Sequence, residues 1–184
     1  MEIYGSFRGI MNTNSVSDLN RRIQRLEDLE AIRQLKHRYL NACDQQLPDL
    51  ARDCFADGEI VIDMGHLGVF RHRDDFAALY RAAGCQAYVL DMHHGGNSEI
   101  DFMTDDHAHA LWLLNYRNIN TREKTVTFLS VRYHDEYRRI DGEWYITHSR
   151  SEFKTALHCT YGNGVLQLLR AADSMAGAVD YSES

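Results

Sequence analysis

The sequence has little proline, no paired cysteine motif and no long apolar run, and each of these absences excludes a class of protein. Pro48 is the only proline, and no segment has the biased composition of a disordered chain. No run approaches the roughly 20 apolar residues that a membrane-spanning helix needs, and residues 1–14 lack the pattern of a signal peptide. The 184 residues therefore predict one globular domain, which we expect to be cytoplasmic.

The charge and the scattered cysteines and histidines exclude further classes. Against 20 Lys and Arg stand 27 Asp and Glu, and the net charge of -7 without a basic stripe argues against a nucleic-acid or membrane partner. The cysteines have no CxxC spacing, and the histidines form no HExxH motif. His107 and His109, two residues apart, supply too few ligands for a metal by themselves, so the sequence predicts no metal site.

The spacing of apolar residues predicts helices first and strands second. Apolar residues recur every three or four positions over residues 15–46, which predicts one long amphipathic helix. Turn residues such as Asp141-Gly142 favour tight hairpins between the later strands. We expect further helices at residues 48–56, 73–84 and 165–172, and strands at 59–64, 69–71, 87–102, 107–119, 124–139 and 143–153.

This order of elements indicates an α+β fold in which a cone-shaped, strongly curved antiparallel sheet wraps around the N-terminal helices. Such a wrap leaves a pocket between the end of the long helix and the inward positions of the strands. We expect an N-terminal extension at residues 1–14, the α+β domain at 15–158 and a C-terminal segment with a short helix at 159–184.

The candidate reactive side chains lie at the end of the long helix and in the stretch DMHHGGNSEIDF, residues 91–102. Tyr39 and Asp44 are about 140° apart on an ideal helix, so both can border one cavity only if the helix ends near Asp44. A carboxylate paired with His93 or His94 would fix the imidazole tautomer and leave the other nitrogen to abstract a proton. The alternative is that Asp44 is an exposed helix-end residue and Tyr39 an ordinary half-buried aromatic.

Three segments together resemble a known family. They are RLEDLEAIRQLKHRYLNACD, the H-x-x-x-N pattern in HHGGN, and DEYRRIDGEWYI, and the similarity covers roughly residues 17 to 155. Their order and separation resemble the SnoaL-like family of the nuclear-transport-factor-2-like superfamily. The members most similar are the bile acid 7α-dehydratases, the hexachlorocyclohexane dehydrochlorinases and, more distantly, scytalone dehydratase.

The resemblance implies which histidine is reactive. The family's dyad of an Asp near the end of the first helix and a His that leads H-x-x-x-N falls on Asp44 and His93, and the Tyr of the bile acid enzymes falls on Tyr39. Regular strand alternation would instead point His94 to the core with Ile100 and Phe102. A bulge at Gly95-Gly96 would reset the alternation and turn His93 inward.

Other positions are expected to bind substrate. Asn97 closes the H-x-x-x-N pattern, and Trp112 and Phe128 are candidate pocket walls, although such residues are more often plain core. By strand parity Arg150 shares a face with Trp144. An Arg there could bind an anionic group in the pocket, and a surface position is equally open.

The resemblance implies a cofactor-independent lyase, a dehydratase or dehydrohalogenase, that acts on a hydrophobic cyclic small molecule with His93 and Asp44 as general base and Tyr39 as donor. An isomerase or a polyketide-cyclase-like enzyme with the same base is an alternative, and so is a non-catalytic module that binds a small ligand. The resemblance also implies a homotrimer or homodimer.

Overall fold

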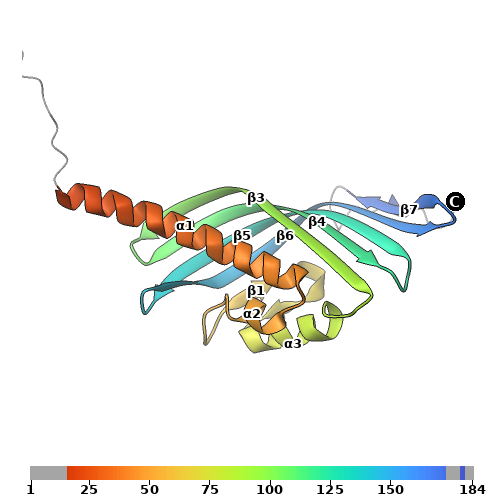
Figure 1. Ribbon diagram of the computed structural model, residues 1–184, viewed down its shortest axis with the longest axis horizontal. Coiled ribbons are helices and arrows are strands. Elements are labelled where there is room, and N and C mark those ends of the chain that lie inside the picture. Colours follow the sequence, from red (N-terminus) through yellow and green to blue (C-terminus); the bar gives the residue numbers. More distant parts are fainter. Residues whose placement is uncertain (1–15, 173–178, 181–184) are drawn as a thin grey trace, which may run out of the picture.

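Three helices pack against one face of a long curved sheet. The computed structural model describes residues 16–172 and 179–180. The helices are α1 (Val16–Asp44), α2 (Pro48–Arg52) and α3 (Arg73–Ala83); in Figure 1 α1 runs across the sheet, and α2 and α3 lie below it. The predicted α+β fold is confirmed. Among the described helices, none is both long and apolar enough to cross a bilayer.

The sheet has the order β2-β1-β6-β5-β4-β3, with β7 beside β6 and β8 beside β7. Its long hairpins are antiparallel as predicted, whereas the short β1 runs parallel to β6, so the sheet is mixed and unclosed. A turn of 3-10 helix, Gly65–Leu67, joins the first two strands. The strands are β1 (Val61–Asp63), β2 (Val69–Phe70), β3 (Val89–Thr104), β4 (His107–Asn120), β5 (Thr125–Ile140), β6 (Glu143–Gly162), β7 (Val165–Ala172) and β8 (Val179–Asp180).

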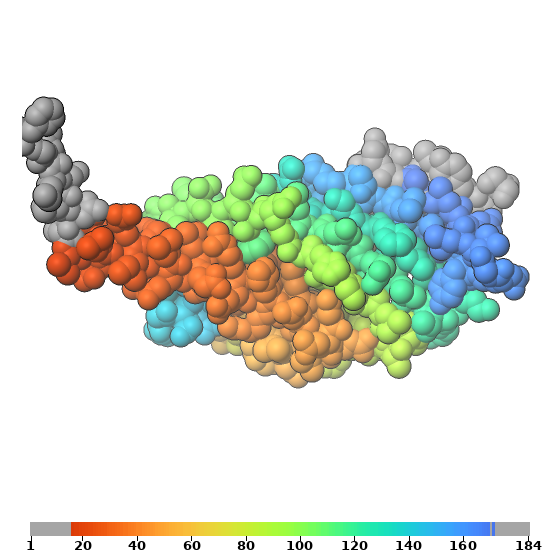
Figure 2. Space-filling view, turned by 45° about the horizontal axis from the view of Figure 1, so that its top comes forward, coloured from red at the N-terminus to blue at the C-terminus, as the bar shows by residue number. Residues whose placement is uncertain are grey.

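The first turns of α1 extend past the sheet. The apolar residues Leu19, Ile23 and Leu26 follow the predicted helical spacing, but they are 45%, 53% and 65% exposed. Figures 1 and 2 show this red and orange part of the helix projecting at one end of the molecule. Burial begins at Asp28, which accepts the indole N–H of Trp144, and apolar burial begins at Ile32, so only the second half of α1 positions residues for a cavity.

The segment predicted as a helix at residues 165–172 is the strand β7, and that prediction was wrong. Asn163 and Gly164 both have positive φ, 51° and 76°, which is the backbone of a type I′ hairpin turn. This turn sends the chain back along β6, which is longer than predicted and continues to Gly162. The boundary expected after residue 158 therefore falls inside a strand, and the predicted extension at residues 1–14 lies outside the described residues.

A bulge in β3 sets which side chains face the helices. The register shifts between Gly96 and Glu99, so that one extra residue is accommodated, and Asn97 takes the left-handed φ of 48°. Before the bulge His93 is on the inward face, and after it Ile100 is. The reset of alternation expected from the sequence is thus present, one step later than Gly95-Gly96.

A charged pair lies in the core beneath the end of α1. Lys36 Nζ is 2.8 Å from Asp135 Oδ2, and neither side chain is exposed to solvent. The Asp135 carboxylate also accepts hydrogen bonds from the hydroxyls of Tyr137, at 2.8 Å, and Ser149, at 2.7 Å. Lys36 Nζ lies 3.7 Å from the centre of the Tyr133 ring. A buried charge with this many partners ties α1 to β5 and β6.

Candidate active site

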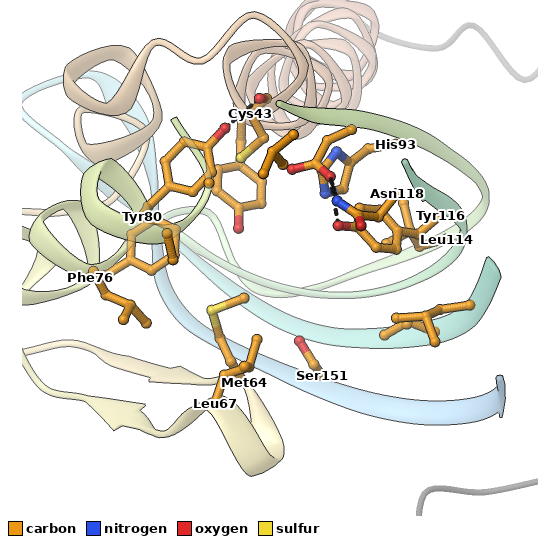
Figure 3. A pocket seen from close by; sticks show the side chains of 18 of the residues that line it. Cys43, Met64, Leu67, Phe76, Tyr80, His93, Leu114, Tyr116, Asn118 and Ser151 are labelled. Carbon is orange, nitrogen blue, oxygen red and sulfur yellow. Dashed lines mark hydrogen bonds between the residues drawn. The ribbon is translucent and has the colours of Figure 1, made fainter. Parts of the chain in front are cut away.

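A cavity of about 430 Å³ lies between the second half of α1, α3 and the inward face of the sheet. In Figure 3, His93, Tyr116 and Asn118 lie on one side of it, Phe76 and Tyr80 on another, and Met64, Leu67 and Ser151 below. A cavity of this size and mostly apolar lining suits a small organic ligand. The remaining lining residues are Tyr39, Cys43, Leu79, Ala83, Gly84, Val89, Asp91, Leu114, Asn120, Leu129, Val131, Tyr133 and Phe153.

Asp44 and His93 meet at the edge of this cavity. Asp44 is the last residue of α1, and its Oδ1 lies 2.6 Å from His93 Nδ1. The same carboxylate accepts the backbone N–H of His93, at 3.0 Å for Oδ1 and 3.2 Å for Oδ2. The side chain of Asp44 is 25% exposed, and that of His93 is 13% exposed. Since a carboxylate only accepts hydrogen bonds, the short contact places the proton on Nδ1 and leaves the lone pair on Nε2.

Gly95 allows α1 to approach β3 closely enough for this contact. A Cβ built on Gly95 would lie 2.5 Å from Cδ1 of the buried Leu40, so the Leu40 side chain would have to shift to make room for it. On the cavity side the ring of Tyr116 covers His93, with 4.7 Å between ring centroids. The imidazole is thus held between an aromatic face and a carboxylate that the backbone N–H of His93 itself fixes.

A second carboxylate, that of Asp91, lines the same cavity. Its Oδ1 accepts hydrogen bonds from the Tyr116 hydroxyl and from the Asn118 amide, both at 2.7 Å. Two donors on one oxygen fix the orientation of the carboxylate. Within the described residues no hydrogen bond falls on Oδ2, which leaves this atom to accept one from a ligand.

Tyr39 lines the cavity from α1, one turn before Asp44. Burial, more than the neighbouring Cys43, raises the pKa of the Tyr39 phenol well above its ordinary value. Burial likewise raises the pKa values of Tyr116 and Tyr133. These phenols therefore stay protonated across the physiological range and can act as hydrogen-bond donors.

Comparison with known proteins identifies the family. The model of the SnoaL-like domain matches residues 24–150. The chain belongs to the SnoaL-like domain family. The fold expected from the sequence resemblance is also that of several solved structures.

Three solved structures illustrate this likeness of fold. A putative scytalone dehydratase from Novosphingobium aromaticivorans is 19% identical with a TM-score of 0.67, over 83% of this chain and 95% of that chain. A type 2 hexachlorocyclohexane dehydrochlorinase is 16% identical with a TM-score of 0.68, over 78% and 99%. A nuclear-transport-factor-2-like protein with a cystatin-like fold, also from N. aromaticivorans, is 21% identical with a TM-score of 0.62, over 76% and 90%.

Two of the expected substrate-binding residues of this SnoaL-like chain lie outside the cavity lining. Asn97 is exposed, because its left-handed backbone forms the bulge itself. Phe128 is half-buried on the opposite face of β5, where it lies between Arg117 and Leu157 of the neighbouring strands. The cavity wall on β5 is formed instead by Leu129, Val131 and Tyr133.

Trp112 and Arg150 are also placed elsewhere. Trp112 is 1% exposed in the core, where its indole N–H donates to the Tyr137 hydroxyl at 3.1 Å. Arg150 is exposed on the outer face of the sheet. Strand parity predicted that Arg150 shares the face of Trp144, but a register shift opposite Glu136 and Tyr137 reverses the alternation of β6 between them.

Asp91 and Asn118 are site residues that sequence reasoning missed. Asp91 stands two residues before His93, and strand alternation places both on one face, so its position could have been inferred from the same parity argument. The partners Tyr116 and Asn118 lie on β4, opposite His93 and Asp91 in the ladder. No local pattern in the sequence indicates that pairing, which is set by the register of the hairpin.

Proposed function

We propose that this SnoaL-like protein is a cofactor-independent lyase that eliminates water from a hydrophobic cyclic small molecule. The observation that carries the proposal is the 2.6 Å contact between Asp44 Oδ1 and His93 Nδ1 at the edge of a largely apolar cavity. The names of two relatives in fold, a dehydrochlorinase and a putative scytalone dehydratase, point to eliminations and support it.

In the proposed reaction His93 is the general base. Its Nε2 takes a proton from the carbon beside the leaving group, and the C–H electron pair forms the new double bond while the C–O bond breaks. Asp44 stabilises the imidazolium that results, since it already accepts the Nδ1 proton and cannot rotate away from the backbone N–H of His93. The departing hydroxide accepts a hydrogen bond from the neutral Tyr39 phenol and takes the proton that His93 Nε2 has just accepted, so that it leaves as water and the imidazole becomes neutral again.

The lining of the cavity favours a hydroxyl over an anion as the leaving group. Among the described residues, those that line it include no lysine or arginine. Asp91 Oδ2 can accept a hydrogen bond from a second hydroxyl of the substrate, which would orient the ring over His93. We therefore propose a substrate with a mostly apolar ring, a leaving hydroxyl beside an acidic C–H bond, and a further hydroxyl. We also propose a cytoplasmic homodimer or homotrimer.

The test is a screen of cyclic hydroxy ketones by mass spectrometry for products that have lost one water. With a substrate identified, His93→Ala and Asp44→Asn should each lower kcat/KM by at least about 100-fold, which is the lower end of the range expected when a general base is lost. Tyr39→Phe should lower it less. His94→Ala is the matched control, because His94 is an exposed imidazole next to His93 and should leave turnover unchanged.

Two results would contradict the proposal. Full turnover by His93→Ala or by Asp44→Asn would remove the base from the mechanism. A product that has the substrate's mass in ordinary water and a shifted double bond, and that takes up deuterium when the reaction runs in deuterium oxide, would keep the base but make the enzyme an isomerase.

A further inference from the structure

The outer face of the sheet, opposite the cavity, carries a row of ionisable side chains across four strands. Asp101 of β3 lies opposite His109 of β4, His109 opposite Glu136 of β5, and Glu136 opposite His148 of β6. Neighbours in such a row are close enough for their side chains to meet. His107 is on the same face of β4 as His109, because successive side chains of a strand alternate.

Within this group three side chains converge. His107 Nε2 lies 3.4 Å and His109 Nε2 3.9 Å from Glu136 Oε2, and all three potential ligand atoms fall within 4.8 Å of one another. The two imidazole rings meet edge to face, with 4.8 Å between centroids. Their side chains range from 15% exposed for His107 to 46% for His109, so the group is open to solvent on one side.

His107 Nε2 is a second sign that a ligand is accommodated here. This nitrogen is shielded from solvent, yet it makes no hydrogen bond of good geometry, although Glu136 Oε2 is within ion-pair distance. A buried polar nitrogen without a hydrogen-bond partner is uncommon in folded proteins. A metal ion between the three side chains would be coordinated by the lone pair of His107 Nε2.

We propose that His107, His109 and Glu136 form a binding site for a divalent first-row transition metal ion such as Zn²⁺. Two imidazoles and one carboxylate are a donor set that such ions accept, with water completing the coordination. Ligand atoms about 2.0 to 2.2 Å from a tetrahedral metal are about 3.3 to 3.6 Å apart, and the 3.4 Å between His107 Nε2 and Glu136 Oε2 already satisfies this. His109 Nε2 must come a few tenths of an ångström closer to Glu136 Oε2, and the ligand atoms of the two histidines, which lie within 4.8 Å, must close by up to roughly 1.5 Å, a movement that the half-exposed His109 side chain can make.

The role of this site is structural. The site residues face away from the cavity, whose wall on β4 is formed by Leu114 and Tyr116. A metal ion held by His107, His109 and Glu136 links β4 to β5 at the end of the sheet remote from β7, and it does not reach His93. The sequence pattern pointed away from a metal because Glu136 is distant in the chain from the two histidines and approaches them only through the β4–β5 ladder.

The experiment is a titration of the full-length, EDTA-treated protein with Zn²⁺ by calorimetry, and with Co²⁺ by visible absorption. The proposal expects one equivalent of metal to bind. It also expects metal at about 100 times its dissociation constant to raise the midpoint of thermal unfolding by roughly 5 to 10 °C. His109→Ala and Glu136→Gln should each weaken binding at least about tenfold. Circular dichroism of both metal-free variants verifies that they fold.

Two control variants separate this site from other imidazoles. His94→Ala removes an exposed histidine of β3, and His93→Ala removes an imidazole that contacts a carboxylate elsewhere in the chain; both should bind metal like the parent chain. No saturation at about 100 μM metal, which is roughly a hundredfold above a micromolar dissociation constant, would overturn the proposal. So would binding that is unchanged in His109→Ala and Glu136→Gln, or binding that is lost in His93→Ala.

Discussion

Breaking the buried Lys36–Asp135 pair should be among the most destabilising changes available in this chain. Lys36→Met leaves the Asp135 carboxylate without its counter-ion in a site that solvent does not reach, and Asp135→Asn leaves the Lys36 ammonium in the same position. Removal of one partner of a buried ion pair costs about 3 to 5 kcal/mol. Each single variant should therefore lose that much free energy of unfolding.

The double variant Lys36→Met/Asp135→Asn separates the pair from its surroundings. Neither charge is then left alone, and the asparagine oxygen can accept one of the hydrogen bonds that the Tyr137 and Ser149 hydroxyls donate to Asp135, while its NH2 group can donate to the oxygen of the other hydroxyl. We expect the double variant to be about as stable as either single one, so that the two effects fall short of additivity by more than about 2 kcal/mol.

Urea unfolding followed by circular dichroism measures these free energies. Arg33→Met, an exposed cation on the same helix, is the matched control and should change the free energy of unfolding by less than about 0.5 kcal/mol. The coupling would be refuted if the double variant lost as much free energy of unfolding as the two single variants together, to within about 0.5 kcal/mol. The argument that the pair ties α1 to the sheet would then fail as well.

Two further predictions concern the cavity. Gly95→Ala should cost about 1 to 3 kcal/mol of unfolding free energy, because its Cβ would lie 2.5 Å from Leu40 Cδ1. The control Gly96→Ala should not destabilise, because a Cβ there meets nothing within 4 Å. Equal urea midpoints for the two variants would contradict this prediction. Burial raises the pKa of Tyr39, so above about pH 10 the unfolded chain loses a proton that the folded chain keeps. Stability is therefore complete below that pH and declines as the pH rises, and Tyr39→Phe should make the decline shallower; an unchanged slope of unfolding free energy against pH would count against the burial of this phenol.

The parts of the fold that depend on local pattern could be predicted from the sequence. The acidic residues at its start and Gly84 at its close predicted the ends of α3 to within one residue, and the strand-like runs predicted the order of the four long strands. The turn residues Asp141 and Gly142 have φ of 50° and 89°, as the tight turn expected there requires. The same reasoning missed β7, although Asn163-Gly164 is an equally strong hairpin signal, because the leucines that follow were read with helical spacing.

The site was predictable only where it depends on the resemblance and on one strand's parity. His93 and Asp44 do meet, and the bulge that turns His93 inward was expected. Arg150 was misplaced, since a second bulge in β6 carries no glycine or other local mark. The partners of Asp91 and the approach of Glu136 to His107 depend on strand register, which spacing along one strand does not determine.

Because of the extra residue in β3, the side chains that face the cavity and those that face the core do not follow a single inward–outward alternation along the strand. The side chains that pack inward after Asn97 and those that face the ligand space before it belong to two alternations that differ by one step. Loss of a single residue at that point would let the hydrophobic half keep its register while His93 turned to solvent. A change of length by one position could thus yield a folded protein with an empty, inert cavity, and close homologues are best compared by counting residues across this bulge.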